Sequence, residues 1–125
     1  MKKAKTILFL EDEQELVDAV GNLLRDHGYD VITTARAEDA LQIMQKSTPD
    51  LILADIKLPG MDGFEFFTES RKSEHLRDIP FIYLTAYNNL DAMLYAKKMG
   101  AAEYITKPFE FEYLVMRIRE LLPPS

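Results

Sequence analysis

The sequence predicts an α/β fold in one domain over residues 1–125: a single doubly wound sheet of five parallel strands with helices on both faces. A chain of 125 residues suits one compact domain. Short apolar runs recur along it, and runs that do not alternate with polar residues are typical of strands buried on both faces. Segments with helical spacing separate these runs, so strand and helix alternate, which indicates a parallel sheet.

The predicted strands are four apolar runs and one weaker segment. The clearest runs are residues 6–10, 51–54 and 81–84, which hold almost no polar side chains. Residues 31–34 are less apolar, and residues 103–106 are the weakest candidate. Strands this short are ordinary in a small sheet.

The predicted helices follow from apolar residues spaced three or four apart and from the residues that end them. Gly28 and Gly100 follow the first and fourth helices, where a left-handed C-terminal cap is expected. The third helix begins near Gly63, and Asp62 is its predicted N-cap. The apolar stripes of the other four helices are Leu16, Val17, Val20, Leu23 and Leu24; Ala37, Ala40, Leu41 and Met44; Leu90, Met93 and Leu94; and Phe111, Leu114, Val115, Ile118 and Leu122.

The composition argues against several classes of protein. A formal net charge of -6 argues against a nucleic-acid binder with a basic face. The chain has no cysteine, which excludes disulfides and thiolate chemistry and suits a reducing compartment. Its basic start is followed by too few apolar residues for a signal peptide, and no run approaches the roughly 20 apolar residues of a membrane span. We therefore expect a cytoplasmic protein that binds neither nucleic acid nor membrane directly.

Polar side chains follow four of the predicted strands. Glu11 and Asp12 come directly after the first strand, and Asp55 follows the third. Thr85 follows the fourth strand and Lys107 the fifth. Since ligands of open parallel sheets bind at the carboxyl ends of the strands, these side chains are expected to converge on one binding edge.

Each of these residues also has an ordinary structural interpretation. Asp12 suits an N-cap of the first helix, and an isolated Glu11 is usually just solvated. Thr85 suits a turn, and Lys107 suits a side chain that extends along the surface. Their joint placement at one edge nevertheless favours a functional site.

The residue types at this edge point to phosphoryl chemistry. Three neighbouring carboxylates repel one another unless a cation is present, and oxygen-only ligands suit Mg²⁺. A lysine and a hydroxyl beside such a cation suit a phosphoryl group, and an aspartate can attack phosphorus to form an acyl phosphate. The glycine-rich phosphate-binding motifs GxGxxG and GxxxxGK(S/T) are both absent from the sequence, so nucleotide binding is not expected.

These segments resemble the receiver domains of response regulators in two-component signalling. Residues 50–64 look like the phosphoacceptor segment of that family, and residues 7–13 look like its acidic pocket. Residues 84–86 and 104–109 match its switch threonine and its lysine segment. The resemblance covers essentially the whole chain and implies a flavodoxin-like (βα)5 fold with strand order 2-1-3-4-5.

The resemblance implies a role for each residue of the edge. Asp55 is expected to accept a phosphoryl group from a phosphohistidine on a sensor histidine kinase or histidine phosphotransfer protein. Asp12, Asp55 and the main-chain carbonyl of Lys57 are expected to ligate Mg²⁺, with Glu11 holding a metal-bound water. Lys107 is expected to pair with a phosphoryl oxygen. Glu11 differs from the aspartate that is usual in the family, so its carboxylate reaches one methylene further.

The resemblance also implies a switch. Thr85 turns its hydroxyl toward the phosphoryl group, Tyr104 moves inward, and the Lys107-Pro108 peptide bond is cis. The readout for a downstream effector protein is a population shift that alters the fourth helix, fifth strand and fifth helix. Tyr104 has a second interpretation, as an edge-strand aromatic packed on the fourth helix. Tyr87 is bulky and expected to shield the acyl phosphate from water, so that self-hydrolysis is slow.

Charged residues near the end of the chain suit a phosphorylation-dependent homodimer, or simply a solvated face. They include Lys98, Glu103, Arg117 and Arg119.

Two other functions are consistent with part of the pattern. A haloacid-dehalogenase-type phosphohydrolase also uses a nucleophilic aspartate with Mg²⁺, threonine and lysine. It needs an acid two residues after the nucleophile, where this sequence has Lys57, and a cap domain does not fit the length. A receiver that only docks partners without phosphorylation is the other alternative. We expect a phosphoacceptor that catalyses its own phosphorylation and dephosphorylation, and not a turnover enzyme.

Overall fold

A computed structural model describes residues 3–124 and shows five parallel strands in the order β2-β1-β3-β4-β5. This confirms the predicted fold class and strand order. Residues 1, 2 and 125 of the predicted domain lie outside the described residues. The strands are β1 (Thr6–Leu10), β2 (Asp30–Thr34), β3 (Leu51–Ala54), β4 (Phe81–Thr85) and β5 (Glu103–Thr106). The helices are α1 (Gln14–Asp26), α2 (Ala37–Lys46), α3 (Gly63–Arg71), the short 3-10 helix η1 (Glu74–Leu76), α4 (Leu90–Met99) and α5 (Phe111–Leu121).

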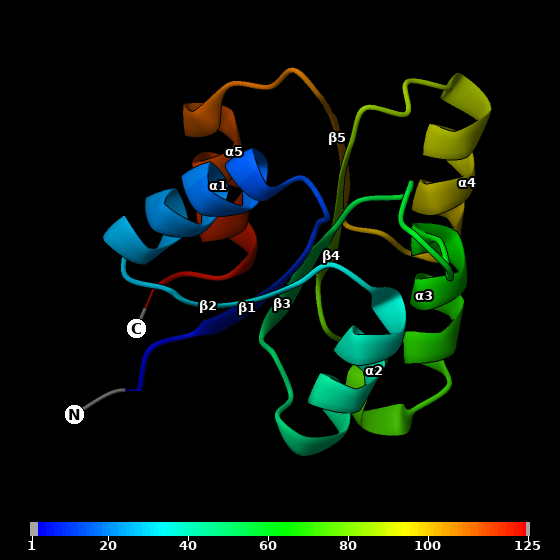
Figure 1. Cartoon of the computed structure of the whole chain (residues 1–125), viewed down its shortest axis with the longest axis horizontal. Helices are drawn as coiled ribbons and strands as arrows, with labels where there is room; N and C mark the ends of the chain where they lie inside the picture. The colour runs from blue at the N-terminus through cyan, green and yellow to red at the C-terminus, as the bar shows by residue number, and fades with distance from the viewer. Residues whose placement is uncertain (1–2, 125) are drawn as a thin grey trace.

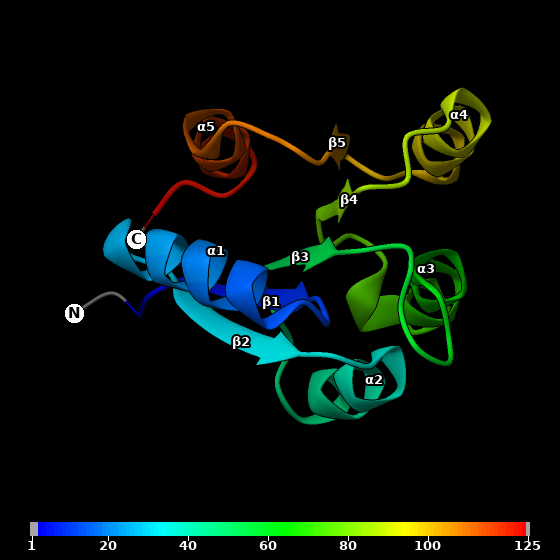
Figure 2. The ribbon, with the colours of Figure 1, turned by 45° about the horizontal axis from the view of Figure 1, so that its top comes forward.

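The sheet lies between two layers of helices, α1 and α5 on one face and α2, α3 and α4 on the other (Figures 1 and 2). Successive side chains of a strand point to opposite faces. Accordingly, Ile7 and Phe9 of β1 pack in the core under α1 and α5, while Leu8 and Leu10 pack in the core under α2 and α3. All four are fully buried, which explains why β1 reads as a continuous apolar run.

The ends of the helices largely follow the predicted signals. Gly28 and Gly100 adopt positive φ angles of 94° and 113°, as expected for left-handed caps. Asp62 caps α3, because its side chain accepts a hydrogen bond from a main-chain N–H in the first turn. The N-cap of α1 is Glu13, so Asp12 does not cap that helix. The short η1 was not predicted, since three residues provide no helical periodicity.

Within residues 3–124, every helix falls short of the length and apolar character that crossing a bilayer requires.

Candidate functional site

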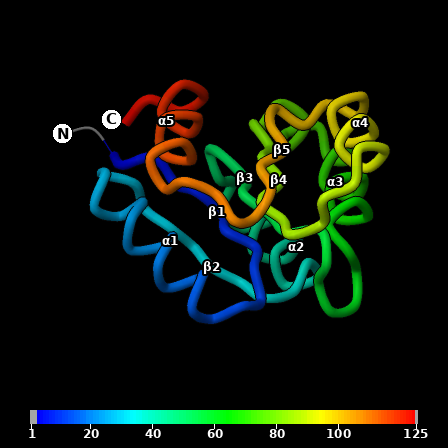
Figure 3. Tube along the Cα trace, turned by 90° about the horizontal axis from the view of Figure 1, so that it is seen from above, coloured from blue at the N-terminus to red at the C-terminus, as the bar shows by residue number. Residues whose placement is uncertain are grey.

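The parallel pairing of β1 and β3 brings the first group of polar residues together. Leu10 pairs with Ala54, and the main-chain N–H of Asp55 donates to the carbonyl of Leu10 at 3.0 Å. The residues that follow the two strands, Glu11 and Asp55, therefore emerge side by side. The traces of β4 and β5 lie beside β3 (Figure 3), and because Thr85 pairs with Thr106 in the parallel ladder, these two strands end at the same edge of the sheet.

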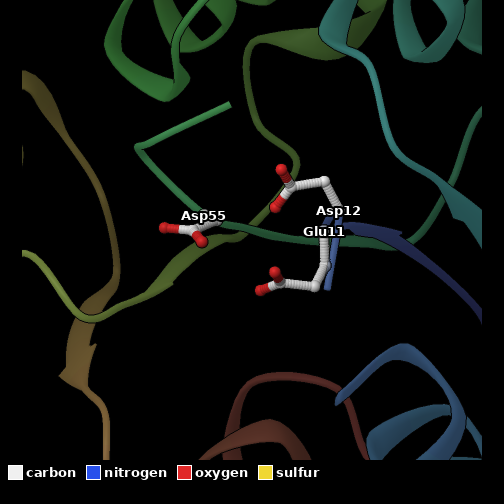
Figure 4. Close-up of side chains that lie close together, drawn as sticks. All are labelled: Glu11, Asp12 and Asp55. Atoms are coloured by element: carbon white, nitrogen blue, oxygen red, sulfur yellow. The ribbon is translucent and has the colours of Figure 1, made fainter. Parts of the chain in front are cut away.

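Three carboxylates gather at this edge (Figure 4). Ligand oxygens of Glu11, Asp12 and Asp55 all lie within 4.8 Å of one another. Glu11 and Asp55 are 2% and 6% exposed, whereas Asp12 is exposed. The predicted convergence of carboxylates at one edge of the sheet is thus present in the structure.

Lys107 supplies a positive charge to the two buried carboxylates. Its Nζ lies 2.8 Å from Glu11 Oε1 and 3.2 Å from Asp55 Oδ2. Burial disfavours the charged ammonium, but the hydrogen bond to Glu11 and the charges of both carboxylates outweigh it and raise the pKa of Lys107. The ammonium therefore stays protonated at neutral pH. The Lys107-Pro108 bond is cis, as the family resemblance implies.

The surroundings of Glu11 disfavour its charged form. Burial raises its pKa above the ordinary value, and the negative charge of Asp55 raises it further. The ammonium of Lys107 and the main-chain N–H of Glu13, which donates to Glu11 Oε2 at 3.1 Å, lower it only in part. We refer to Glu11, Asp12, Asp55 and Lys107 as the acidic site. Three carboxylates with one ammonium leave an excess of negative charge.

The donors of the acidic site fit a hard divalent cation. All of its carboxylate oxygens are hard ligands, and two of the three carboxylates are buried. Mg²⁺ prefers a few such oxygens and keeps several waters, which the exposed side of the site at Asp12 allows. The repulsion among the carboxylates is the free energy that a cation would relieve.

The orientation of the Asp55 side chain is fixed by its own loop. Asp55 Oδ1 accepts hydrogen bonds from the main-chain N–H groups of Ile56, at 2.6 Å, and Lys57, at 3.4 Å. Its other oxygen, Oδ2, is the one that faces Lys107. The carboxylate is thereby presented in a single orientation at the edge of the sheet.

Thr85 and Tyr104 are joined through Tyr87. Thr85 is fully buried at the end of β4, and its Oγ1 accepts a hydrogen bond from the N–H of Tyr87 at 3.1 Å. Tyr104 is 5% exposed and packs against the ring of Tyr83, and its hydroxyl donates to the carbonyl of Tyr87 at 2.5 Å. Tyr104 thus lies inward in this structure.

The ring of Tyr87 also contacts the loop after β3. The ammonium of Lys57 lies 4.5 Å from the centroid of that ring, a cation–π contact. The sequence predicts that Tyr87 is a bulky cover, but it does not predict the main-chain bonds of Tyr87 to the two switch residues. No sequence signal reports them, because they depend on how the β4–α4 loop folds back.

A second group of charges, the Glu103 cluster, lies where β5 meets α4 and α5. Glu103 accepts a hydrogen bond from Arg117 Nε at 2.9 Å, and its other oxygen lies 3.7 Å from Lys97 Nζ. The hydroxyl of Tyr113 lies 3.4 Å from the same oxygen that Arg117 contacts. Glu103 and Arg117, two of the charges expected to suit a homodimer, are therefore paired within the chain.

The surroundings of Glu103 favour its charge. Burial alone would raise the pKa of this carboxyl. The hydrogen bonds from the Tyr104 N–H and Arg117, and the charges of Lys97 and Arg117, outweigh burial and lower the pKa.

Comparison with known proteins identifies the family. Residues 7–119 match the model of the response regulator receiver domain, and the chain belongs to this family. It is 35% identical over 116 residues to the response regulator SaeR of Staphylococcus aureus, a match that covers 93% of this chain and 50% of that protein. The chain thus spans about half the length of the curated relatives it matches.

Solved structures agree with this assignment. A putative response regulator from Chloroflexus aurantiacus superposes with a TM-score of 0.90 at 33% identity, covering 96% of this chain and 98% of that chain. The receiver domain of a sensor histidine kinase from Pseudomonas aeruginosa, which has a magnesium ion in its active-site cleft, gives a TM-score of 0.86 at 28% identity, covering 95% and 98%.

The acidic pocket of Glu11, Asp12 and Asp55 fits the Mg-binding phosphoacceptor site of a receiver domain. Receiver domains are phosphoacceptors and not conventional enzymes, and the haloacid-dehalogenase alternative is not favoured.

Proposed function

We propose that residues 1–125 form a receiver domain in which Asp55 accepts a phosphoryl group from a phosphohistidine. The observation that carries this proposal is the contact of one partly buried ammonium, on Lys107, with two buried carboxylates, on Asp55 and Glu11. In the reaction a bond forms between a carboxylate oxygen of Asp55 and phosphorus. The bond from phosphorus to the histidine nitrogen of the donor breaks.

The side chains of the acidic site position and neutralise the transferred group. Asp12, Asp55 and the main-chain carbonyl of Lys57 are the proposed direct donors to Mg²⁺, and Glu11 orients a water. The cation, when bound, neutralises charge on the phosphoryl oxygens. Lys107 keeps its proton and donates a hydrogen bond to one of those oxygens. Its present contacts with Glu11 and Asp55 place the ammonium beside the phosphoacceptor for this role.

The proposed switch uses the hydrogen bonds around Tyr87. The hydroxyl of Thr85 exchanges its bond with the Tyr87 N–H for one with a phosphoryl oxygen. Because Tyr104 is bonded to the carbonyl of the same residue, this exchange moves the β4–α4 loop and shifts the position of α4.

The surface that changes is formed by α4, β5 and α5, and it is the proposed contact for a downstream effector protein. Large apolar side chains are exposed on it, which suits a partner interface. They include Leu90, Leu94, Met99 and Tyr113.

The phosphoryl donor would be a sensor histidine kinase or a histidine phosphotransfer protein, and a phosphorylation-dependent homodimer is a further proposed state. We further propose that the protein is cytoplasmic and contacts neither nucleic acid nor membrane directly. The chain promotes its own phosphorylation and dephosphorylation without turning over external substrates.

The direct test uses a small acyl phosphate donor, Mg²⁺ and intact-protein mass spectrometry. We expect the wild-type chain to gain one phosphoryl group and the Asp55→Asn variant to gain none. Asp30→Asn, which changes an exposed aspartate at the opposite end of the sheet, is the matched control and should behave as wild type. Turnover of the donor without a retained phosphoryl group would support a phosphohydrolase, and a complete lack of reaction would support a docking module.

A further inference from the structure

The loop between β3 and α3 carries the proposed main-chain donor to the cation, and both of its ends are fixed. At its start, the N–H of Ile56 donates to Asp55 Oδ1. At its end, the N–H of Gly63 donates to the carbonyl of Ile56 at 2.8 Å. A Cβ at Gly63 would lie 2.3 Å from the carbonyl oxygen of Asp55, so α3 begins directly against the backbone of the phosphoacceptor.

The far part of this loop is held by a side chain from another helix. The N–H of Met61 donates to Glu38 Oε2 at 3.2 Å. Among residues 3–124, this is the only side-chain hydrogen bond that joins residues 57–61 to α2. Gly60 adopts a φ of 75°, and a Cβ there would lie 2.7 Å from Glu38 Oε2 and 2.8 Å from Arg36 Nη2. The carboxylate therefore lies directly on the loop backbone.

Glu38 is suited to this contact by its place in α2. It lies in the first turn, where a negative charge is favoured by the helix dipole. Hydrogen bonds from its own main-chain N–H and from Met61, aided by the charge of Arg36, lower its pKa, so it is ionised at neutral pH. Its Oε1 is buried without a hydrogen-bond partner among the described residues, which leaves Oε2 as the oxygen that engages the loop.

We propose that Glu38 is a positioning residue: it ties the top of the β3–α3 loop to α2 and so fixes the main chain at Lys57. This proposal rests on the proposed function, in which the carbonyl of Lys57 is a donor to Mg²⁺. A loop that is already ordered loses little conformational freedom when the cation binds, whereas a free loop must be ordered in the same step. Contacts that bond a metal ligand directly are worth about 10- to 100-fold in metal affinity, and because Glu38 bonds Met61 and not a ligand, we expect an effect at the low end of this range.

The test compares four chains: wild type, Glu38→Ala, Glu38→Gln and the control Asp39→Ala. Asp39 is an exposed acid in the same turn of α2, so its loss changes the same charge and dipole terms without removing a loop contact. Mg²⁺ affinity is measured by titration calorimetry. Hydrogen exchange at the Met61 amide is measured in the same proteins without the cation. Thermal unfolding checks that each variant is folded, which the half-exposed position of Glu38 favours.

We expect Glu38→Ala to weaken Mg²⁺ binding about tenfold and to speed exchange at Met61. Glu38→Gln keeps an oxygen acceptor and should stay within about threefold of wild type, and Asp39→Ala should match wild type. The proposal is overturned if Glu38→Ala binds Mg²⁺ as tightly as wild type, or if Asp39→Ala weakens binding equally. A wild-type chain that took up no Mg²⁺ would instead defeat the proposed function, while the exchange at Met61 would still show whether Glu38 holds the loop.

Discussion

The acidic site and the Glu103 cluster differ in their balance of negative and positive charge. In the acidic site, three carboxylates share one ammonium, and burial raises the pKa of Glu11. In the Glu103 cluster, the carboxylate of Glu103 meets two cations, Lys97 and Arg117, and Arg117 also contacts the exposed carboxylate of Glu120, so the charges balance and the pKa of Glu103 is lowered. Glu103 therefore stabilises the fold in its ionised form, whereas ionised Glu11 opposes it.

This difference separates a structural ion cluster from a functional one. A cluster that serves only the fold can balance its charges within the chain, as Glu103 does with Lys97 and Arg117. The acidic site keeps an imbalance that only an added cation or a change of protonation can remove. Removal of a carboxylate charge from one cluster and from the other should therefore change stability in opposite directions.

Removal of the one positive charge from the acidic site should cause the greatest loss of stability. Lys107→Met leaves the buried carboxylates of Glu11 and Asp55 without their ammonium. We expect a loss of about 3 kcal/mol in the free energy of unfolding, because unpaired buried charges are costly. Urea unfolding at neutral pH without Mg²⁺ measures it. A variant as stable as wild type would mean that Lys107 does not compensate these charges.

Removal of a negative charge from the acidic site should stabilise the protein. Glu11→Gln should raise the free energy of unfolding at neutral pH without Mg²⁺, by less than Lys107→Met lowers it, because burial disfavours the charged carboxylate of Glu11 and raises its pKa. A group with a raised pKa stabilises the fold more when protonated. The advantage of the variant should therefore grow as pH rises above the ordinary value of 4.5 and vanish in acid. Equal stability at all pH values would contradict this assignment.

The same substitution in the Glu103 cluster should destabilise the protein. Glu103→Gln removes the charge that Arg117 and Lys97 contact, and we expect a loss of about 1 kcal/mol at neutral pH. Because the pKa of Glu103 is lowered, its contribution is present above the ordinary value of 4.5 and is lost as pH falls through the lower pKa of the folded state. Urea unfolding of wild type and of Glu103→Gln across this acid range would show whether the difference in stability disappears as pH falls. A loss that persisted in strong acid would argue against an electrostatic origin.

The smallest effect concerns the cover of the acidic site. Tyr87 contacts Lys57 beside Asp55, and we expect it to slow the approach of water to the acyl phosphate. Tyr87→Ala should shorten the lifetime of phosphorylated Asp55 about threefold, less than 1 kcal/mol in barrier. Decay of the phosphorylated mass with Mg²⁺ present measures it. Tyr87→Phe keeps the ring and should retain the wild-type lifetime. Equal decay rates in the two variants would show that the ring of Tyr87 does not shield the acyl phosphate from water.

The sequence predicted the fold well because the strands are buried on both faces. Residues 51–54 are fully buried and therefore form a continuous apolar run, and a run of four residues is too short for a helix. The two weaker predicted strands, residues 31–34 and 103–106, belong to the two edge strands, β2 and β5, where partial exposure admits polar side chains. The strand order came from the family resemblance, since periodicity does not report which strands pair.

The gathering of the acidic site was also predictable, because its residues directly follow strands whose ends must meet. Asp12 was harder to interpret, since its position suits an N-cap, and only the structure showed that Glu13 takes that place. The contacts of Glu38 and Tyr87 could not be predicted. Glu38 and Met61 are 23 residues apart and meet only because α2 packs beside the β3–α3 loop.

The central claim is that the carboxylates of the acidic site are kept in excess to hold Mg²⁺ beside Asp55. The most direct measurement is the unfolding midpoint of the wild-type chain and of Asp12→Asn across a titration with Mg²⁺ at constant ionic strength. The wild-type midpoint should rise steadily, with about 2.7 kcal/mol of added stability at one hundred times the dissociation constant, and the variant should respond far less. A wild-type midpoint that did not move with Mg²⁺, or an equal rise in Asp12→Asn, would contradict the claim.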